Sequence, residues 1–191
     1  MDFNLSPEIA DLRRRIAHFV EERVMPLEAE PGSYDEHENI RFDLLDGLRA
    51  EARAEGLWAL QMPRERGGQG LPVVGMAVTY EAMGRSIFGP PTFNCAAPDD
   101  GNMILLNRVA TEAQKDRWLQ PIVDGKVRSS FVMTEPAPGA GSDPSMMQTK
   151  AERRGDRWIV NGRKACGACS SNPRTAAPVS ARSAWRSATR L

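Results

Sequence analysis

Apolar residues recur at steps of three and four positions near the start of the chain, which is the spacing of an amphipathic helix. The residues that share one helical face are Ile9, Leu12, Ile16, Phe19 and Val20. Residues 6–8, Ser-Pro-Glu, form a helix start. The serine hydroxyl can cap a main-chain N–H, proline fits the first turn, and the acid faces the positive end of the helix dipole. We expect Pro26 to stop or kink this helix, since proline has no N–H to donate.

Two further helices are predicted by the same spacing. The second ends at Gly56, and its inward residues are Leu44, Leu45, Leu48 and Ala52. The third runs from about Pro72 to Gly84. Its expected buried face consists of Val73, Met76, Ala77, Tyr80 and Met83.

A fourth helix is predicted near residues 101–109, and a fifth begins at Thr111. Thr111 and Gln114 form a capping box, in which each side chain bonds the main chain of the other residue. The fifth helix is expected to bury Trp118, Leu119 and Ile122. Periodic apolar and aromatic residues of this kind mainly pack a bundle, so we interpret them as core rather than as a cofactor site.

The apolar positions begin to alternate after Gly125, which is the pattern of β-strands. Residues 129–134 are expected to form one strand, and residues 147–152 alternate in the same way. A turn at residues 155–156, Gly-Asp, precedes a further apolar run, and residues 161–162, Asn-Gly, are a strong hairpin signal. These strands are expected to follow the helices as a separate domain.

The pattern therefore predicts an α+β chain in three parts. Residues 1–125 form an all-α helical bundle domain, and residues 126–164 form the first strands of an incomplete β-domain. Residues 165–191 contain seven Ala, five Ser and four Arg, with no Lys, Asp or Glu. Such a composition cannot bury enough apolar surface to offset chain entropy, so we expect a disordered tail or an out-of-frame sequence.

Composition excludes several classes of protein. The 25 basic and 25 acidic residues balance, so nothing indicates a nucleic-acid partner. The N-terminus has no signal-peptide pattern, and no apolar run approaches the roughly 20 residues that span a bilayer. Three cysteines are too few for a disulfide framework, which favours a cytoplasmic protein. Cys166 and Cys169 have CxxC spacing, but nothing stands at ligand spacing to complete a metal site, so no metal is expected.

The most informative stretch is residues 131–143, Phe-Val-Met-Thr-Glu-Pro-Ala-Pro-Gly-Ala-Gly-Ser-Asp. An apolar strand opens here into a loop of small residues. Glycine lets main-chain amides approach a ligand closely, and successive amides with a serine hydroxyl can cradle an anion such as a pyrophosphate. An ordinary glycine turn gives the same local pattern, so the neighbouring motifs decide between the two interpretations.

The Thr-Glu-Pro…Gly-Ser-Asp string resembles the signature of the acyl-CoA dehydrogenases, flavin enzymes that desaturate acyl thioesters between Cα and Cβ. Further matching blocks occur in the family order: residues 66–70 (Arg-Gly-Gly-Gln-Gly), 80–84 (Tyr-Glu-Ala-Met-Gly), 111–115 (Thr-Glu-Ala-Gln-Lys) and 161–164 (Asn-Gly-Arg-Lys). The resemblance extends from Phe3 to Lys164. Ala137 and Pro138 lengthen the commoner form of the signature, which puts the contacts of the loop in question.

This resemblance implies an oxidoreductase with FAD as cofactor, an acyl-CoA substrate, and a β-barrel-like middle domain after the helices. It also implies electron-transfer flavoprotein or a similar acceptor as partner, and a homo-oligomer for the full-length enzyme. The residues implied to contact the flavin ring are Phe131, Met133 and Thr134. Gly141 and Ser142 are implied to lie along the FAD pyrophosphate, with Ser142 also near the CoA arm.

The resemblance places the catalytic base of the family beyond residue 191, so we expect no catalytic residue in this stretch and no activity from it alone. Glu81 and Glu112 fit solvated or capping roles on helices, and Glu135 follows a strand. None of the three is expected to be a base. A base must first lie within hydrogen-bond reach of the proton that it removes, and only then does its pKa matter. The alternative hypothesis is a non-catalytic product: a truncated remnant, or a helical interaction module without flavin chemistry.

Overall fold

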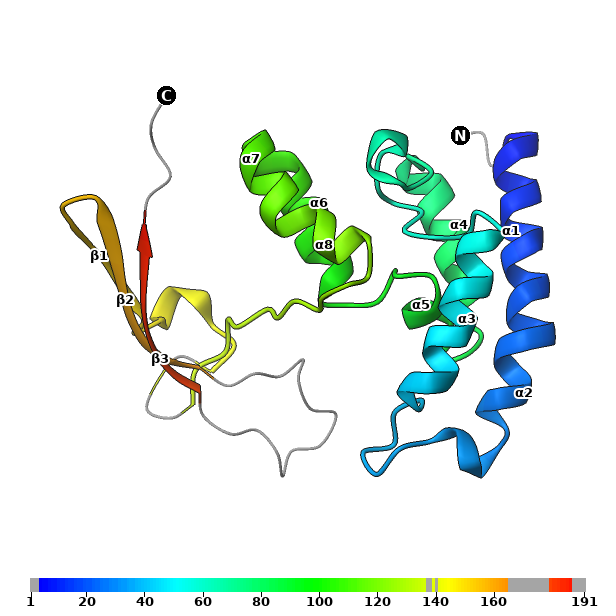
Figure 1. Cartoon of the computed structure of the whole chain (residues 1–191), viewed down its shortest axis with the longest axis horizontal. Coiled ribbons are helices and arrows are strands. Elements are labelled where there is room, and N and C mark those ends of the chain that lie inside the picture. The colour runs from blue at the N-terminus through cyan, green and yellow to red at the C-terminus, as the bar shows by residue number, and fades with distance from the viewer. Residues whose placement is uncertain (1–3, 137–138, 140, 165–178, 187–191) are drawn as a thin grey trace. The chain divides into compact units, whose positions relative to one another are not determined.

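The computed structural model describes residues 4–136, 139, 141–164 and 179–186 (Figure 1). The chain divides into two compact units, Met1–Ser129 (unit 1) and Ser130–Leu191 (unit 2). Unit 1 is helical and unit 2 contains an antiparallel sheet. The expected order of a helical domain followed by β-strands is confirmed.

The α-helices of unit 1 are α1 (Pro7–Phe19), α2 (Met25–Glu28), α3 (Phe42–Ala54), α4 (Val73–Met83), α5 (Gly89–Thr92), α6 (Asp99–Val109), α7 (Glu112–Gln114) and α8 (Gln120–Val123). Two π-helical turns, Val20–Val24 and Lys115–Leu119, and two 3-10 turns, Pro31–Ser33 and Arg64–Arg66, lie between them. Both predicted caps are present. The Ser6 side chain accepts a hydrogen bond from the Ile9 N–H, and Thr111 and Gln114 form the capping box.

The first helix does not stop at Pro26. A π-helical turn follows α1 directly, and the Met25 N–H donates to the Val20 carbonyl five residues earlier. Pro26 then lies in the first turn of α2, where its missing N–H costs little. The wider turn shifts the hydrogen-bond register just before the proline, which is how the helical path continues to Glu28.

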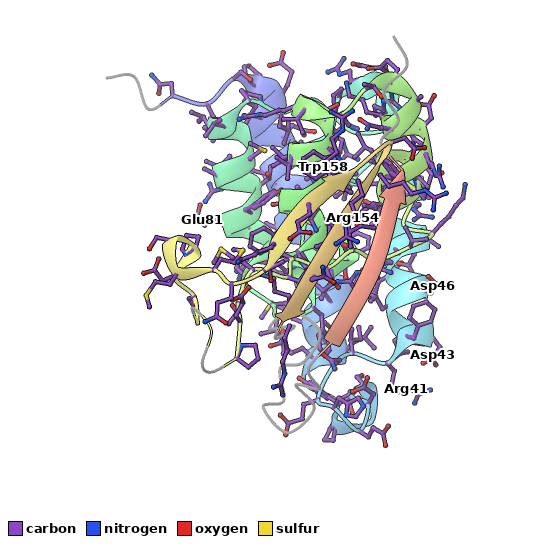
Figure 2. The ribbon with its side chains drawn as sticks, turned by 90° about the vertical axis from the view of Figure 1, so that its left-hand side faces the viewer. Arg41, Asp43, Asp46, Glu81, Arg154 and Trp158 are labelled. Atoms are coloured by element: carbon purple, nitrogen blue, oxygen red, sulfur yellow. The ribbon has the colours of Figure 1, made fainter. Side chains whose placement is uncertain are left out.

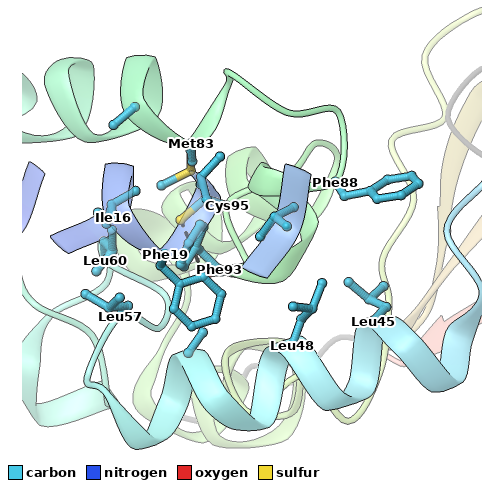
Figure 3. Packing of buried hydrophobic residues seen from close by; sticks show 14 of the residues in the cluster. Ile16, Phe19, Leu45, Leu48, Leu57, Leu60, Met83, Phe88, Phe93 and Cys95 are labelled. Atoms are coloured by element: carbon cyan, nitrogen blue, oxygen red, sulfur yellow. Dashed lines mark hydrogen bonds between the residues drawn. The ribbon is translucent and has the colours of Figure 1, made fainter. Parts of the chain in front are cut away.

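The larger core of unit 1 combines buried residues of α1 and α3 with residues from the segments between Leu57 and Cys95 (Figure 3). Phe19 and Phe93 are both buried and meet edge to face, with their ring centroids 5.4 Å apart. Leu12 and Ile16 from α1 and Leu48 from α3 are buried in the same cluster. This packing follows the periodicity of the sequence directly.

A second, smaller core forms around Trp58 and Met103. The non-helical segment 57–62 joins the two cores, because Leu57 and Leu60 belong to the larger cluster whereas its other apolar residues belong to the smaller one. The Trp58 indole N–H donates to the Val123 carbonyl at 2.7 Å, so the polar atom of this buried ring is satisfied.

The predicted inner face of α4 was partly wrong. Met83 is buried as expected, but Val73 is 73% exposed and Ala77 is also exposed. The buried residues of the helix are Gly75, Thr79, Ala82 and Met83. Apolar residues surround this helix on all sides, so periodicity could not select a face. The close approach of α1 selects it instead, since a Cβ on Gly75 would lie 3.4 Å from the Ile9 side chain.

In unit 2 the strands β1 (Lys150–Arg154), β2 (Arg157–Lys164) and β3 (Val179–Arg186) pair antiparallel in the order β1-β2-β3. A 3-10 turn, Pro144–Met146, precedes them. The two-residue turn at 155–156 joins β1 to β2 as predicted, with Gly155 at φ +63°. The hairpin expected at Asn161-Gly162 is wrong, because both residues lie inside β2. Gly162 instead allows a close approach, since a Cβ there would overlap the Thr149 side chain.

Two other segments differ from expectation. Residues 129–134 form no strand ladder with any described residue, because an extended segment becomes a strand only beside a partner. Within the tail expected to be disordered, residues 179–186 form β3 along the full length of β2. The open edge of β2 offers main-chain groups that any sequence can pair with. Residues 165–178 and 187–191 lie outside the described residues.

The larger core predicts a sharp contrast between two phenylalanines. Phe93 is fully buried and Phe42 is 71% exposed. Phe93→Ala should lower the free energy of unfolding by about 3–5 kcal/mol, because it removes a buried ring and leaves a cavity. Phe42→Ala, the matched control, should change it by no more than about 0.5 kcal/mol. Urea denaturation followed by circular dichroism measures both, and equal effects would contradict the assigned core.

Candidate functional site

The Glu135 carboxylate joins three described segments of unit 2. It is 4% exposed, and it is the one buried residue among those of unit 2 whose side chains the structure describes. One oxygen, Oε2, accepts from the Gln148 N–H at 2.7 Å. The other, Oε1, accepts from the Thr149 N–H at 2.8 Å, from the Thr149 hydroxyl at 2.5 Å and from the Lys164 ammonium at 3.0 Å. The loop, the residues before β1 and the end of β2 therefore meet at one side chain.

The glycine-rich loop folds around the same residue. The Glu135 N–H donates to the Gly141 carbonyl at 3.0 Å, and the Gly141 N–H donates back to the Glu135 carbonyl at 3.1 Å. A Cβ on Gly139 would lie 2.7 Å from the Glu135 Cβ and 2.9 Å from Oε2, so only glycine fits there. Gly141 has φ +58°, a conformation that glycine adopts without strain.

Lys164 links this loop to the strand-like segment before it. Its ammonium donates to the Met133 carbonyl at 3.1 Å as well as to Glu135. The lysine side chain is 14% exposed, and the glutamate side chain 3%. A buried charge is tolerated when it is paired and hydrogen-bonded. Here the Glu135 carboxylate accepts four hydrogen bonds and the Lys164 ammonium donates two.

The five predicted ligand-contacting residues lie close together in the sequence, but they differ in exposure and in whether protein groups already bond them. Phe131 is 55% exposed, whereas Met133 and Thr134 are half-buried. Among the described residues, nothing in the protein bonds the Thr134 hydroxyl or the exposed Ser142 hydroxyl. The Gly141 amide is already bonded to Glu135, so of the two predicted pyrophosphate contacts Ser142 retains the unused donor. Ala137 and Pro138 lie outside the described residues.

A second buried carboxylate, Asp99, binds the last residues of unit 1. Asp99, at the start of α6, accepts from the Ser129 N–H at 2.6 Å and from the Ser129 hydroxyl at 2.7 Å. It also forms an ion pair with Arg128. These bonds fix the last residues of unit 1, two positions before the predicted flavin-contacting segment.

All three glutamates considered as bases are engaged by other protein groups. Hydrogen bonds, first from the Thr149 side chain and then from the Gln148 main chain, lower the pKa of Glu135 to about 2. A carboxylate held so acidic is a weak proton acceptor. Glu112 pairs with Lys115 and Arg66, and those hydrogen bonds lower its pKa. Glu81 projects from the surface of unit 1 and pairs with Arg13 at 3.2 Å (Figure 2).

Within the described residues, every buried side-chain nitrogen and oxygen has a hydrogen-bond partner. The Tyr80 hydroxyl donates to Asp100 at 2.9 Å, and the Cys95 thiol donates to the Gln61 side chain at 3.2 Å. Burial raises the pKa of Cys95 to about 12, which makes this thiol unreactive. The described residues contain no group of three or more acidic, histidine or cysteine side chains that could hold a metal ion, and Cys166 and Cys169 lie outside them. Within the same residues, no helix has the length and apolar character to cross a membrane.

Comparison with known proteins identifies the family. Residues 6–126 match the family model described as "Acyl-CoA dehydrogenase, N-terminal domain". The chain belongs to the acyl-CoA dehydrogenase family. The resemblance inferred from the signature is confirmed, and it places the chain in a family of oxidoreductases.

Individual relatives of this acyl-CoA dehydrogenase chain agree. It is 39% identical to mouse acyl-CoA dehydrogenase family member 10 over 84% of its length, and 37% identical to a probable acyl-CoA dehydrogenase, FadE2, of Mycobacterium tuberculosis over 91%. A solved structure of a putative acyl-CoA dehydrogenase from Mycobacterium abscessus is 41% identical and superposes with a TM-score of 0.74 over 85% of the chain. The chain spans only 16%, 43% and 42% of these three proteins.

Glu135 and Lys164 were not predicted as members of the site. The acyl-CoA dehydrogenase signature contains the glutamate, and residues 161–164 end with the lysine, but the two are far apart in sequence. Local patterns do not show that the strand containing Lys164 returns to the loop. The sequence contains one signal for the buried carboxylate. Glu135 lies outside any amphipathic helix and is followed by a glycine-rich loop.

The hydrogen bonds to Glu135 predict an unusual titration. Its carboxyl carbon, followed by NMR, should titrate with a midpoint near 2 instead of its ordinary 4.5. Because the folded pKa is lowered, the stabilisation is complete above pH 4.5 and is lost as the pH falls towards 2. Thr149→Val removes the hydroxyl donor at nearly constant shape and should move the midpoint upward. Ser145→Ala, whose hydroxyl bonds Asp143 instead, should leave it unchanged. A wild-type midpoint at 4.5 would contradict the assigned network.

Proposed function

We propose that the chain is the N-terminal portion of an FAD-dependent acyl-CoA dehydrogenase that desaturates an acyl-CoA thioester between Cα and Cβ. Family membership supports this class of reaction. The observation that carries the assignment to this site is the unused donor set at residues 131–134 beside a glycine-rich loop. When bound, FAD would supply the hydride acceptor.

The donor set fits the polar edge of a flavin ring. That edge presents carbonyl oxygens and ring nitrogens that accept hydrogen bonds. In the described part of the chain, the main-chain N–H groups of Met133 and Thr134 and the Thr134 hydroxyl donate to no protein group. The exposed Phe131 offers an apolar surface next to them. These residues would hold the ring, and Ser142 would lie along the pyrophosphate and the CoA arm.

The same proposal assigns the remaining roles outside these residues. The paired states of Glu81, Glu112 and Glu135 leave no base among them, so the carboxylate that removes the α-proton belongs to another part of the full-length enzyme. We propose electron-transfer flavoprotein or a similar acceptor as the redox partner, and a homo-oligomer as the full-length form. The low cysteine content supports a cytoplasmic location.

A flavin titration tests the proposal. The chain should quench FAD fluorescence saturably but weakly, because residues 131–142 supply only part of a flavin site. Thr134→Val keeps the shape and removes one donor, so it should weaken binding by about threefold to tenfold, the range for one lost hydrogen bond.

Ser145→Ala is the matched control, because it removes an exposed hydroxyl of the same unit that bonds only to Asp143 among the described residues. Its affinity for FAD should equal that of the wild type. A folded chain that gives no saturable quenching would favour the non-catalytic helical module instead.

A further inference from the structure

We propose that Lys164 is a positioning residue for the flavin-contacting segment: its ammonium holds the Met133 carbonyl and thereby turns the Thr134 N–H toward the cofactor. The inference rests on the proposed function, and it concerns a residue that touches neither the flavin nor the substrate. It is carried by the hydrogen bonds of Lys164, the planarity of one peptide group, and the unused donors of Thr134.

Lys164 bridges both sides of Thr134. Its Nζ donates to the Met133 carbonyl at 3.1 Å and to the Glu135 carboxylate at 3.0 Å. An ammonium has three donors and no acceptor, so two of the three are used within one three-residue segment. Both contacts are largely shielded from water, since the two charged side chains are 14% and 3% exposed. Hydrogen bonds to charged groups in such surroundings are stronger than neutral ones.

The consequence for Thr134 follows from peptide geometry. The Met133 carbonyl and the Thr134 N–H belong to the same peptide group, which is planar and trans, so the two point in opposite directions. Fixing the carbonyl toward Lys164 therefore points the Thr134 N–H away from it. Among the described residues this N–H and the Thr134 hydroxyl have no protein acceptor. One residue thus presents two donors with a fixed main-chain orientation, which suits the acceptor-rich edge of a flavin.

The lysine is itself held rigidly. It ends β2, which pairs with β1 over residues 157–161 and with β3 over residues 157–164, where Lys164 lies opposite Val179. Its second contact, Glu135, is fixed by three further donors from Gln148 and Thr149. A side chain can position another group only if it is itself held in place. The main chain of Lys164 is held by the sheet, and its ammonium is held by Glu135.

The first arm of the test needs no flavin. In the ¹³C-labelled chain, Lys164→Met should shift the Met133 carbonyl resonance upfield, since the carbonyl loses a charged donor, and should shift the Thr134 amide resonance. Lys164→Arg, which can still donate to both groups, should return both resonances toward their wild-type positions. Lys150→Met is the matched control, because Lys150 is an exposed lysine of the neighbouring strand. It should change neither resonance.

The second arm measures FAD affinity by fluorescence quenching in the same four proteins. Lys164→Met should weaken binding about tenfold, as expected for a lost hydrogen bond to a charged group. Lys164→Arg should recover most of the affinity, and Lys150→Met should match the wild type. Wild-type affinity in Lys164→Met overturns the inference and leaves the proposed function standing. The inference is also overturned if Lys164→Arg restores the Met133 resonance but does not restore FAD affinity. A wild-type chain that binds no FAD overturns the proposed function, and this inference with it.

Discussion

The Glu135 carboxylate accepts four hydrogen bonds in a unit where no other described side chain is buried. Small domains usually cohere around an apolar core, but the side chains of β1 are exposed, those of β2 are at most half-buried, and the buried charge lies where the loop meets the residues before β1 and the end of β2. Removing such a charge from water is unfavourable unless every oxygen finds donors. The surrounding sequence supplies them. Gly139 allows the loop to fold onto the carboxylate, and Gly162 leaves room for Thr149 to reach it. Gly139 and Gly162 are therefore needed for the same reason as the Glu135–Lys164 pair: together they keep the buried carboxylate hydrogen-bonded.

The helices of unit 1 were predictable because their signals are local and repeated. A capping serine and a first-turn proline identified α1, three-four spacing identified both α1 and α3, and the buried residues are largely those expected. Failures occurred where a local signal had more than one structural solution. Pro26 ends a regular helix but not one that widens into a π turn beforehand. An Asn-Gly pair favours a turn, but glycine also serves where a strand meets a side chain closely, as at Gly162.

The candidate site was predictable only through the family signature. Composition and spacing indicated a glycine-rich loop after an apolar run, which ordinary turns share. The signature assigned Thr134 and Ser142 to the flavin site, and both hydroxyls are without protein partners in the described residues. It did not show that the Gly141 amide is used internally or that Lys164 returns to Met133. The contact of Lys164 depends on how β2 folds back toward the loop. Sequence spacing does not show that Lys164 and Met133 lie close together in space.

The Glu135 carboxylate holds the glycine-rich loop against the residues that lead into the β1–β2 hairpin, through its hydrogen bonds to Gln148 and Thr149. Amide hydrogen exchange at Gln148 and Thr149 tests it most directly, because both N–H groups donate to this carboxylate. Glu135→Gln keeps the shape but replaces one accepting oxygen by an NH₂ group. At neutral pH at least one of the two amides should exchange about tenfold faster in the variant, since a hydrogen bond to a charged group is lost. The amides of α1, in unit 1, should be unchanged. Equal protection of Gln148 and Thr149 in both proteins would contradict the account.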